Sequence, residues 1–302
     1  MLLSKILEEM GDTTSEIVRD KDFDSMGILI SGYSGSNRCV FVMDESYLGK
    51  LDDSVAVVIT TRDLAKKIYD MDKGVCISLC PRTKFYQIHN FLSTTDAYKR
   101  KEEKTLIDSS SNVSPLAAIA TMNVKIGANV IIENFVDIKE NVIIEDNVII
   151  RSGAVIGGPG YDYKEIDGKL TMTAQIGGII LRKGVEIGSN TCIERAAFPY
   201  EDTEIGEETK IGSLCYVSHG VKIGRKVRMP NCVSISGYSR IGDGASIGPN
   251  ATISNVIHVG SNAFVSLGSV VATSVRRGKH VSGNFAITHD KFLKKYMDDM
   301  RK

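Results

Sequence analysis

The stretch Ile205-Gly-Glu-Glu-Thr-Lys-Ile-Gly-Ser-Leu-Cys-Tyr-Val-Ser-His-Gly-Val-Lys-Ile-Gly224 places an aliphatic residue at every sixth position. The spacing continues outward in two runs, 126–156 and 181–271, with Pro199 at one position of the second run. A period of six fits neither an α-helix nor an alternating strand. It predicts a triangular coil in which each hexapeptide supplies one short strand and one corner, so that the aliphatic side chains point inward and stack on the next coil.

The number of repeats predicts the size of this coil. The two runs hold 22 inward positions, which at three per coil gives about seven coils. Gly often follows the inward residue, as in Ile187-Gly188, and we expect it to help the backbone turn. We therefore predict a mainly β fold, a left-handed parallel β-helix of hexapeptide repeats. A sandwich of ordinary strands would instead show irregular spacings of about 8–12 residues.

One long break interrupts the period. The segment 157–178 opens with Gly157-Gly-Pro-Gly-Tyr-Asp-Tyr-Lys-Glu-Ile-Asp-Gly168, which is rich in turn-forming residues. Long loops on rigid scaffolds usually carry function. We expect a loop that leaves the coil and carries a function. An insertion without a role is the alternative.

The ends of the chain lack the period and predict other structures. Residues 1–100 mix strand and helix patterns, which predicts a small α/β domain. Residues 101–112 are expected to form a polar linker, and the coil is expected over 113–275. Residues 276–302 form a C-terminal tail, in which the segment from His289 predicts a closing helix.

Composition narrows the classes of partner. The 302 residues include 37 basic and 37 acidic side chains, so no net charge directs the chain to nucleic acid or to an anionic membrane. No run approaches the roughly 18 apolar residues of a spanning helix. The six cysteines are scattered, and the pair Cys76 and Cys80 has no second pair to complete a zinc site. We expect a cytoplasmic protein with free thiols, no metal, no nucleic-acid partner and no transmembrane segment.

The stretch around His219 resembles the active-site segment of UDP-3-O-acylglucosamine N-acyltransferases, the trimeric β-helix enzymes of the lipid A (lipopolysaccharide) pathway. The resemblance implies a homotrimer with active sites in the clefts between subunits, and we expect the loop at 157–178 to reach into such a cleft and help cover the substrate. The resemblance extends to shorter motifs: Gly158-Pro-Gly-Tyr161, Gln175-Ile-Gly-Gly178, Val185-Glu-Ile-Gly188, Ile193-Glu-Arg195, Glu201-Asp-Thr203 and Val40-Phe-Val-Met-Asp-Glu-Ser-Tyr47.

The resemblance implies catalytic roles for two residues on one face of the coil. His219 matches the catalytic base of the family, and its place two residues after the inward Val217 predicts a side chain that faces solvent. Imidazole is partly neutral near pH 7, so it suits the removal of a proton from an attacking amine. Gly237 lies one coil further and matches the position whose N–H stabilises an oxyanion. The alternatives are a surface histidine and a corner glycine.

The sequence also departs from the family's pattern. Gly212 stands where the family has an acidic residue, so the group that orients His219 must come from elsewhere. Val256 stands where the family has a second histidine, and His258 is out of register with that position. Cys215 occupies a small inward slot, which predicts a packing residue and not a nucleophile.

The resemblance of the segment 40–47 implies that the α/β domain of residues 1–100 binds a nucleotide sugar. Phe41 and Tyr47 are expected to sandwich a pyrimidine ring, although core aromatics on a strand are the alternative. Asp44 stands where the family usually has Asn, and its carboxylate accepts from the N3–H of uracil or thymine but cannot donate. The motif that ends at Tyr161 adds this residue to the predicted substrate-binding set.

A second group of residues concerns the acyl donor. Arg276 and Arg277 follow the last coil, and their charges suit the phosphates of coenzyme A or phosphopantetheine, with a solvated charge cluster as the alternative. The family's C-terminal extension, which engages acyl carrier protein, is shorter here, which favours a short-chain acyl-CoA. Either thioester is a co-substrate, and no permanently bound cofactor is expected.

Together these features predict an enzyme, an N-acyltransferase. It would move an acyl group from a thioester of coenzyme A or acyl carrier protein to the amino group of a nucleotide-linked amino sugar, by direct attack. An O-acetyltransferase of a polysaccharide precursor would use the same base. A β-helix carbonic anhydrase needs three converging histidines, and His219, His258 and His280 are not spaced for one. A non-catalytic scaffold is the remaining alternative.

Overall fold

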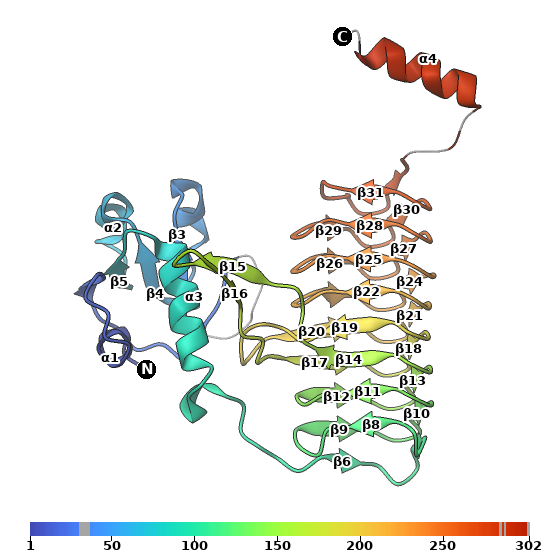
Figure 1. Ribbon diagram of the computed structural model, residues 1–302, viewed down its shortest axis with the longest axis horizontal. Coiled ribbons are helices and arrows are strands. Elements are labelled where there is room, and N and C mark those ends of the chain that lie inside the picture. The colour runs from blue at the N-terminus through green and yellow to red at the C-terminus, as the bar shows by residue number, and fades with distance from the viewer. Residues whose placement is uncertain (30–36, 284–285, 287, 301–302) are drawn as a thin grey trace.

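The computed structural model describes residues 1–29, 37–283, 286 and 288–300. The chain forms a small α/β domain beside a long coil of short parallel strands, and a helix lies beyond the last coil (Figure 1). This arrangement confirms the predicted fold class.

The N-terminal domain is a five-stranded sheet with helices on both faces. The sheet has the order β1-β5-β4-β3-β2, with β1 antiparallel to β5 and the other pairs parallel. Helices α1 and α3 pack on one face and α2 packs on the other, which is why every residue of the apolar strand β4 is buried. The elements are α1 (Leu3–Glu9), β1 (Glu16–Arg19), β2 (Ser25–Met26), β3 (Arg38–Val42), the 3-10 helix η1 (Glu45–Lys50), β4 (Val55–Thr60), α2 (Arg62–Ile68), β5 (Gly74–Ile77), α3 (Pro81–Leu92) and the 3-10 helix η2 (Asp96–Tyr98).

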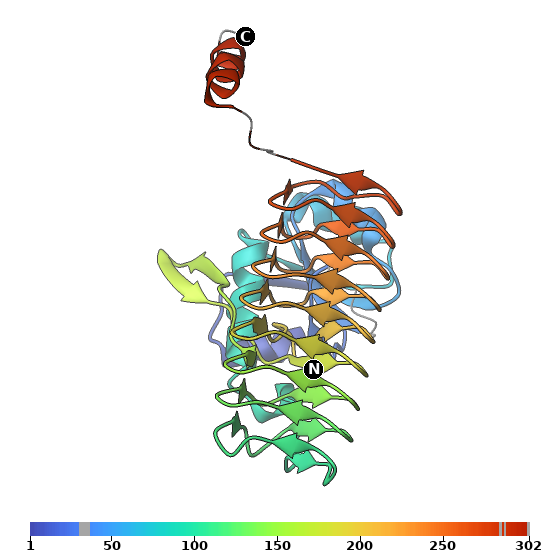
Figure 2. The same ribbon diagram turned by 90° about the vertical axis from the view of Figure 1, so that its right-hand side faces the viewer.

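Three parallel ladders of nine, eight and eight strands form the faces of the coil (Figures 1 and 2). Its strands are β6 (Leu106–Ile107), β7 (Asn112–Val113), β8 (Ala118–Ile119), β9 (Val124–Ile126), β10 (Ile131–Ile132), β11 (Asp137–Ile138), β12 (Val142–Ile144), β13 (Ile149–Ile150), β14 (Val155–Gly158), β17 (Gly178–Leu181), β18 (Glu186–Ile187), β19 (Cys192–Glu194), β20 (Asp202–Ile205), β21 (Lys210–Ile211), β22 (Tyr216–Val217), β23 (Lys222–Ile223), β24 (Arg228–Met229), β25 (Ser234–Ile235), β26 (Arg240–Ile241), β27 (Ser246–Ile247), β28 (Thr252–Ile253), β29 (His258–Val259), β30 (Phe264–Val265), β31 (Val270–Val271) and β32 (His280–Val281).

The inward residues stack as the period predicts. Ile132 pairs with Ile150 and Val217 pairs with Ile235, so counterparts in neighbouring coils are 18 residues apart in the chain. These residues belong to one continuous buried cluster. Cys215 lies in the same cluster and is 2% exposed, which confirms that it is a packing residue.

The coil extends beyond the range 113–275 at both ends. Strand β6 lies inside the segment 101–112 that the polar composition had marked as a linker, and it pairs with β9. At the other end, β32 pairs with β30. The additional strands explain why the ladders hold more coils than the about seven counted from the repeat.

Contrary to our expectation, the glycines that follow the inward residues do not make the turn in the regular coils, and of these glycines Gly157, where the coil breaks, has a positive φ. The left-handed backbone falls two residues later, at Asn129 and Asn190, each with a φ of 55°, and asparagine tolerates this conformation. A Cβ on Gly188 would lie 2.3 Å from the backbone of Gly212 in the next coil. Glycine at this position therefore permits neighbouring coils to stack closely.

The break at 157–178 contains a β-hairpin that leaves the coil, formed by β15 (Tyr163–Ile166) and β16 (Lys169–Met172). The segment after the hairpin is tied to α3 of the N-terminal domain. Asn90 exchanges hydrogen bonds with the backbone of Met172 and Ala174, and His89 Nε2 lies 2.8 Å from the Ala174 carbonyl oxygen. Within the chain, the predicted loop therefore connects the coil to the domain that carries the nucleotide motif.

A second excursion, at residues 195–201, was not predicted. Leu181 pairs with Ile205 and Ile193 pairs with Val217, which are steps of 24 residues in place of 18. Pro199 is therefore not an inward position, and the prediction was wrong at this residue. Phe198 instead joins the core of the N-terminal domain, and this contact holds the domain against the coil.

The C-terminal helix α4 (His289–Met300) lies beyond the coil with all its side chains at least partly exposed (Figure 1). Across the described parts of the chain, no helix has both the length and the apolar character needed to cross a bilayer.

Candidate active site

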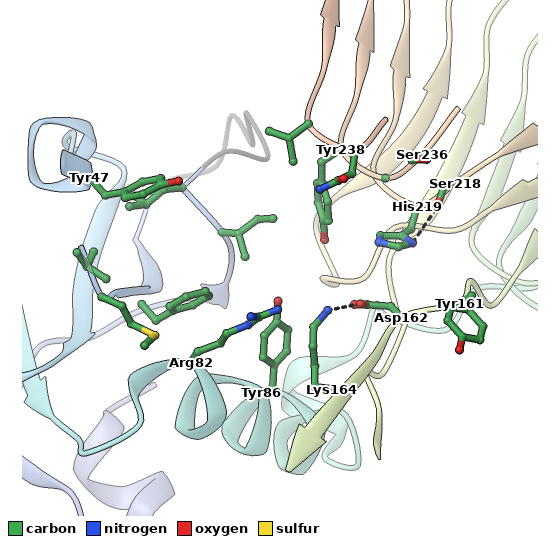
Figure 3. Close-up of a pocket in the computed structure, with 18 of the residues that line it drawn as sticks. Tyr47, Arg82, Tyr86, Tyr161, Asp162, Lys164, Ser218, His219, Ser236 and Tyr238 are labelled. Carbon is green, nitrogen blue, oxygen red and sulfur yellow. Dashed lines mark hydrogen bonds and ion pairs between the residues drawn. The ribbon is translucent and has the colours of Figure 1, made fainter. Parts of the chain in front are cut away.

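The N-terminal domain and the coil enclose a cleft of about 650 Å³ (Figure 3). Strand β3, η1 and α3 line one side, the start of the hairpin lines the bottom, and corners of successive coils line the other side. Arg276 and Arg277 lie on the last coil and are not among the lining residues. The other six predicted site residues line this one cleft: Phe41, Asp44, Tyr47, Tyr161, His219 and Gly237.

His219 lies at a corner directly after β22 and outside the core of the coil. The register predicted a side chain that faces solvent, but the residue is only 8% exposed. The ring of Tyr238 packs edge-on against the imidazole, with 5.3 Å between ring centroids. The histidine is therefore a buried group at the end of a cleft, which a one-dimensional register cannot predict.

Glu194 supplies the acidic group that the sequence lacks at Gly212. Its Oε2 lies 3.0 Å from His219 Nδ1 and accepts hydrogen bonds from the His219 backbone N–H at 3.0 Å and from Ser218 Oγ at 2.8 Å. Its other oxygen accepts from the Tyr216 hydroxyl and from the Tyr161 N–H. The carboxylate is 5% exposed and is thus fully occupied by the groups around the histidine.

These contacts decide the charge of Glu194. Burial acts to raise the pKa of the carboxyl, but the hydrogen bonds from His219, Tyr216 and Ser218 outweigh it and hold the pKa below its ordinary value of 4.5. Burial and the carboxylate raise the pKa of Tyr216 to about 12. An ionised Glu194 accepts a hydrogen bond from the Nδ1–H of the neutral imidazole, and this leaves the lone pair on Nε2.

Gly237 lies directly over the free nitrogen of His219. A Cβ on this glycine would come within 2.8 Å of Nε2, which is closer than a carbon can approach without displacing the ring. None of the described residues accepts a hydrogen bond from the Gly237 N–H. The face of the coil therefore offers a base and an unpaired backbone donor side by side.

The nucleotide motif lies at the opposite end of the cleft (Figure 3). The ring of Phe41 packs against Phe85 with 5.1 Å between centroids, so one of its faces belongs to the domain core. Tyr47 is more exposed, and Lys50 Nζ lies 4.6 Å from its ring centroid. Asp44 already accepts a hydrogen bond from the Ser46 N–H. The side chain of Ser46 and this backbone N–H together lower the pKa of the carboxyl.

Tyr161 enters the site through its backbone. Its N–H donates to Glu194, whereas its side chain is 84% exposed and its ring lies 5.1 Å from that of Tyr163. Gly160 precedes it because a Cβ there would overlap the Glu194 carboxylate. The motif that ends at Tyr161 was predicted to bind substrate, and in the structure its backbone also holds Glu194 in place beside His219.

The three histidines considered for a metal site do not converge within the chain. His219 follows a strand of one ladder, and His258 and His280 belong to the two others. No group of three potential ligands is found in the part of the chain that the structure describes. The His280 ring instead stacks edge-on against Phe264.

Comparisons with known proteins agree with the repeat fold. Residues 123–158 match the family model described as bacterial transferase hexapeptide (six repeats). A UDP-3-O-acylglucosamine N-acyltransferase of Fusobacterium nucleatum is 29% identical over 191 residues, which cover 55% of each chain. The same enzyme of Ectopseudomonas mendocina is 50% identical over 46 residues, which cover 15% of this chain and 13% of that one. The chain thus spans at most about half the length of these curated relatives.

A solved structure, the UDP-N-acetylglucosamine acyltransferase of Francisella novicida, supports the same fold. It superposes with a TM-score of 0.51 at 22% identity and covers 63% of this chain and 71% of its own. The repeat, the three ladders and this structural neighbour assign the chain to the left-handed β-helix fold of hexapeptide repeats. Its sequence is similar to those of the UDP-3-O-acylglucosamine N-acyltransferases.

Proposed function

We propose that the protein transfers an acyl group from a thioester to the amino group of a nucleotide-linked amino sugar, with His219 as general base. The observation that carries the proposal is the arrangement of His219 between Glu194 and Gly237 in a cleft that also holds the nucleotide motif. The names of the relatives support an amino sugar linked to UDP as the acceptor.

The proton path follows from the contacts of the imidazole. Glu194 keeps the proton on Nδ1, so Nε2 takes the proton from the sugar amine as the nitrogen attacks the thioester carbonyl. The carbon–nitrogen bond forms in this step and gives a tetrahedral intermediate. Glu194 stabilises the imidazolium as it forms, because its negative charge lies 3.0 Å from Nδ1.

The second half of the reaction uses the neighbouring coil. The Gly237 N–H donates to the oxyanion of the intermediate. Collapse of the intermediate breaks the carbon–sulfur bond, and the imidazolium returns its proton to the leaving thiolate. No acyl-enzyme is needed, and Cys215, buried in the coil, cannot reach the cleft as a nucleophile.

We expect Gly237→Ala to lower kcat by about 10–100-fold, because the new methyl group displaces the imidazole and crowds the oxyanion site. Gly283→Ala is the matched control, since a Cβ there meets nothing within 4 Å. Steady-state kinetics of both variants measure the effect. Equal activity of Gly237→Ala and wild type would argue against the oxyanion role.

The proposed function is tested by a screen of nucleotide amino sugars against acetyl-CoA, longer acyl-CoA thioesters and hydroxyacyl carrier protein. We expect N-acylated product, detected by mass spectrometry, with a UDP-linked or dTDP-linked amino sugar. We further propose that the active form is a homotrimer, and light scattering on the same preparation measures this. Product from the corresponding hydroxyl sugars alone would assign O-acyl transfer and overturn the proposal.

A further inference from the structure

We infer that Tyr238 keeps acyl substituents of the acceptor out of the active site, so that the acceptor is a nucleotide-linked amino sugar without an O-acyl chain beside its amine. This inference deepens the proposed function and rests on it. The curated relatives are named for an acceptor that carries such a chain, a UDP-3-O-acylglucosamine. The inference therefore distinguishes the acceptor of this chain from the one in their names.

Tyr238 lies at a corner of the coil, directly after Gly237 and one coil beyond Gly220. Its ring packs edge-on against the imidazole of His219, and a Cβ on Gly220 would lie 2.7 Å from two of its ring carbons. In Figure 3 the side chain projects from the coil toward the N-terminal domain, beside the imidazole. The ring therefore lies across the corner that carries the catalytic histidine.

The backbone of Tyr238 is unusual for an aromatic residue. Its φ is 58°, in the left-handed region that bulky side chains rarely adopt. The same kind of corner carries glycine at Gly220 and Gly244 and asparagine at Asn250. Strained backbone of this kind clusters at active sites and ligand clamps. Here it holds a large ring at a place where a small residue would leave space beside His219.

The imidazole of His219 is enclosed on three sides. Glu194 contacts Nδ1, Gly237 lies over Nε2, and the Tyr238 ring covers a further side. The amine of the acceptor must therefore reach Nε2 from the open cleft, with the neighbouring carbons of its sugar close to Tyr238. A chain on the neighbouring hydroxyl would have to run along the corner, where the ring lies.

In the described part of the chain, the surface beside this corner offers no continuous apolar path for a long chain. Val256, one coil beyond Tyr238, is an aliphatic residue at the corner and is 40% exposed. A bound hydrocarbon chain needs apolar walls. The two ladders that meet at the corner instead direct polar or charged side chains outward: Tyr216, Ser234 and Thr252 on one, and Lys222, Arg240 and His258 on the other.

A comparison of acceptors with and without an acyl chain tests the inference. UDP-glucosamine is compared with UDP-glucosamine that carries a ten-carbon acyl chain on its 3-hydroxyl. The best acceptor of the screen is compared with its own ester at the hydroxyl next to the amine. We expect the kcat/KM of the wild type to be at least about 100-fold lower for each ester, because the chain overlaps the Tyr238 ring.

Tyr238→Gly should reduce this ratio of kcat/KM values by at least about tenfold, because glycine tolerates the backbone of the corner and leaves the space open. The ratio cancels any loss of catalysis that is common to both acceptors. Tyr238→Phe keeps the ring and should keep the wild-type ratio. Phe135→Gly is the matched control and should also keep it, since Phe135 is an aromatic residue with a φ of 61° that does not line the cleft.

The outcomes separate this inference from the proposed function. A wild type that prefers the esters, or a folded Tyr238→Gly variant with the wild-type ratio, would overturn the inference and leave the proposed function intact. If the glycine variant does not fold, as judged by circular dichroism, Tyr238→Asn replaces it, because asparagine adopts this backbone at Asn250. No product from any nucleotide amino sugar would reject the proposed function and this inference with it.

Discussion

His219→Ala should lower kcat by about 10²–10⁴-fold, the usual cost of removing a general base. The substitution leaves the inward cluster of the coil untouched, because His219 lies outside that cluster. The protein should therefore keep its circular dichroism spectrum and its oligomeric state. Nucleotide binding should also persist, because the nucleotide motif lies at the other end of the cleft.

The matched control for this variant is His258→Ala. His258 is exposed on β29, on a different ladder, and it does not line the cleft. Its replacement should leave kcat within about twofold of wild type, as for other surface substitutions. If His219→Ala retains more than about a third of the wild-type kcat, far short of the expected loss, the proton leaves by another route and the mechanism is wrong.

Glu194→Gln should lower kcat by about 10²–10⁴-fold with little change in KM for the nucleotide sugar. The corresponding acid-to-amide change in a Ser-His-Asp triad costs about 10⁴-fold, because the amide favours the wrong tautomer of the histidine. Here the amide group of glutamine donates to Nδ1, which places the imidazole proton on Nε2, where it opposes the sugar amine. Glu194 is a positioning residue, since it acts through His219.

The pH profile distinguishes this role from a structural one. The pKa of Glu194 lies below 4.5 in the folded protein, so the wild-type carboxylate stays ionised over the neutral range and causes no inflection there. In Glu194→Gln the acid limb of the kcat/KM profile should move to lower pH, because the charge that favours the imidazolium is gone. A loss of activity at all pH values with an unchanged limb would indicate a structural role instead.

Two further variants complete this test. Tyr216→Phe removes one donor to Glu194 but leaves the contact with His219, so we expect a loss of less than about tenfold. Glu140→Gln changes an exposed carboxylate that pairs with Arg195 outside the cleft, and it should behave like wild type. Thermal unfolding of all three variants shows whether Glu194→Gln still folds.

A regular repeat predicts which residues of neighbouring coils lie next to each other, but only where no excursion interrupts the coil. Gly237 was placed over His219 by counting 18 residues, and the coil between them is regular, so the count holds. Glu194 contacts the same histidine, but the step between their strands is 24 residues because of the excursion at 195–201. The sequence contains the motif Ile193-Glu-Arg195, yet no regular count brings its glutamate under His219.

The sequence by itself determined the coil, the N-terminal α/β domain and six residues that line the cleft from both of these units. An aliphatic residue at every sixth position has only one way to be buried, which is to stack on its counterpart in the next coil. The tertiary structure alone decided that His219 is buried and that Glu194 contacts it. Both features depend on Phe198 and on the segment after the hairpin, which pack on the N-terminal domain. Such contacts join segments that are far apart in the chain, so no periodic pattern in the sequence predicts them.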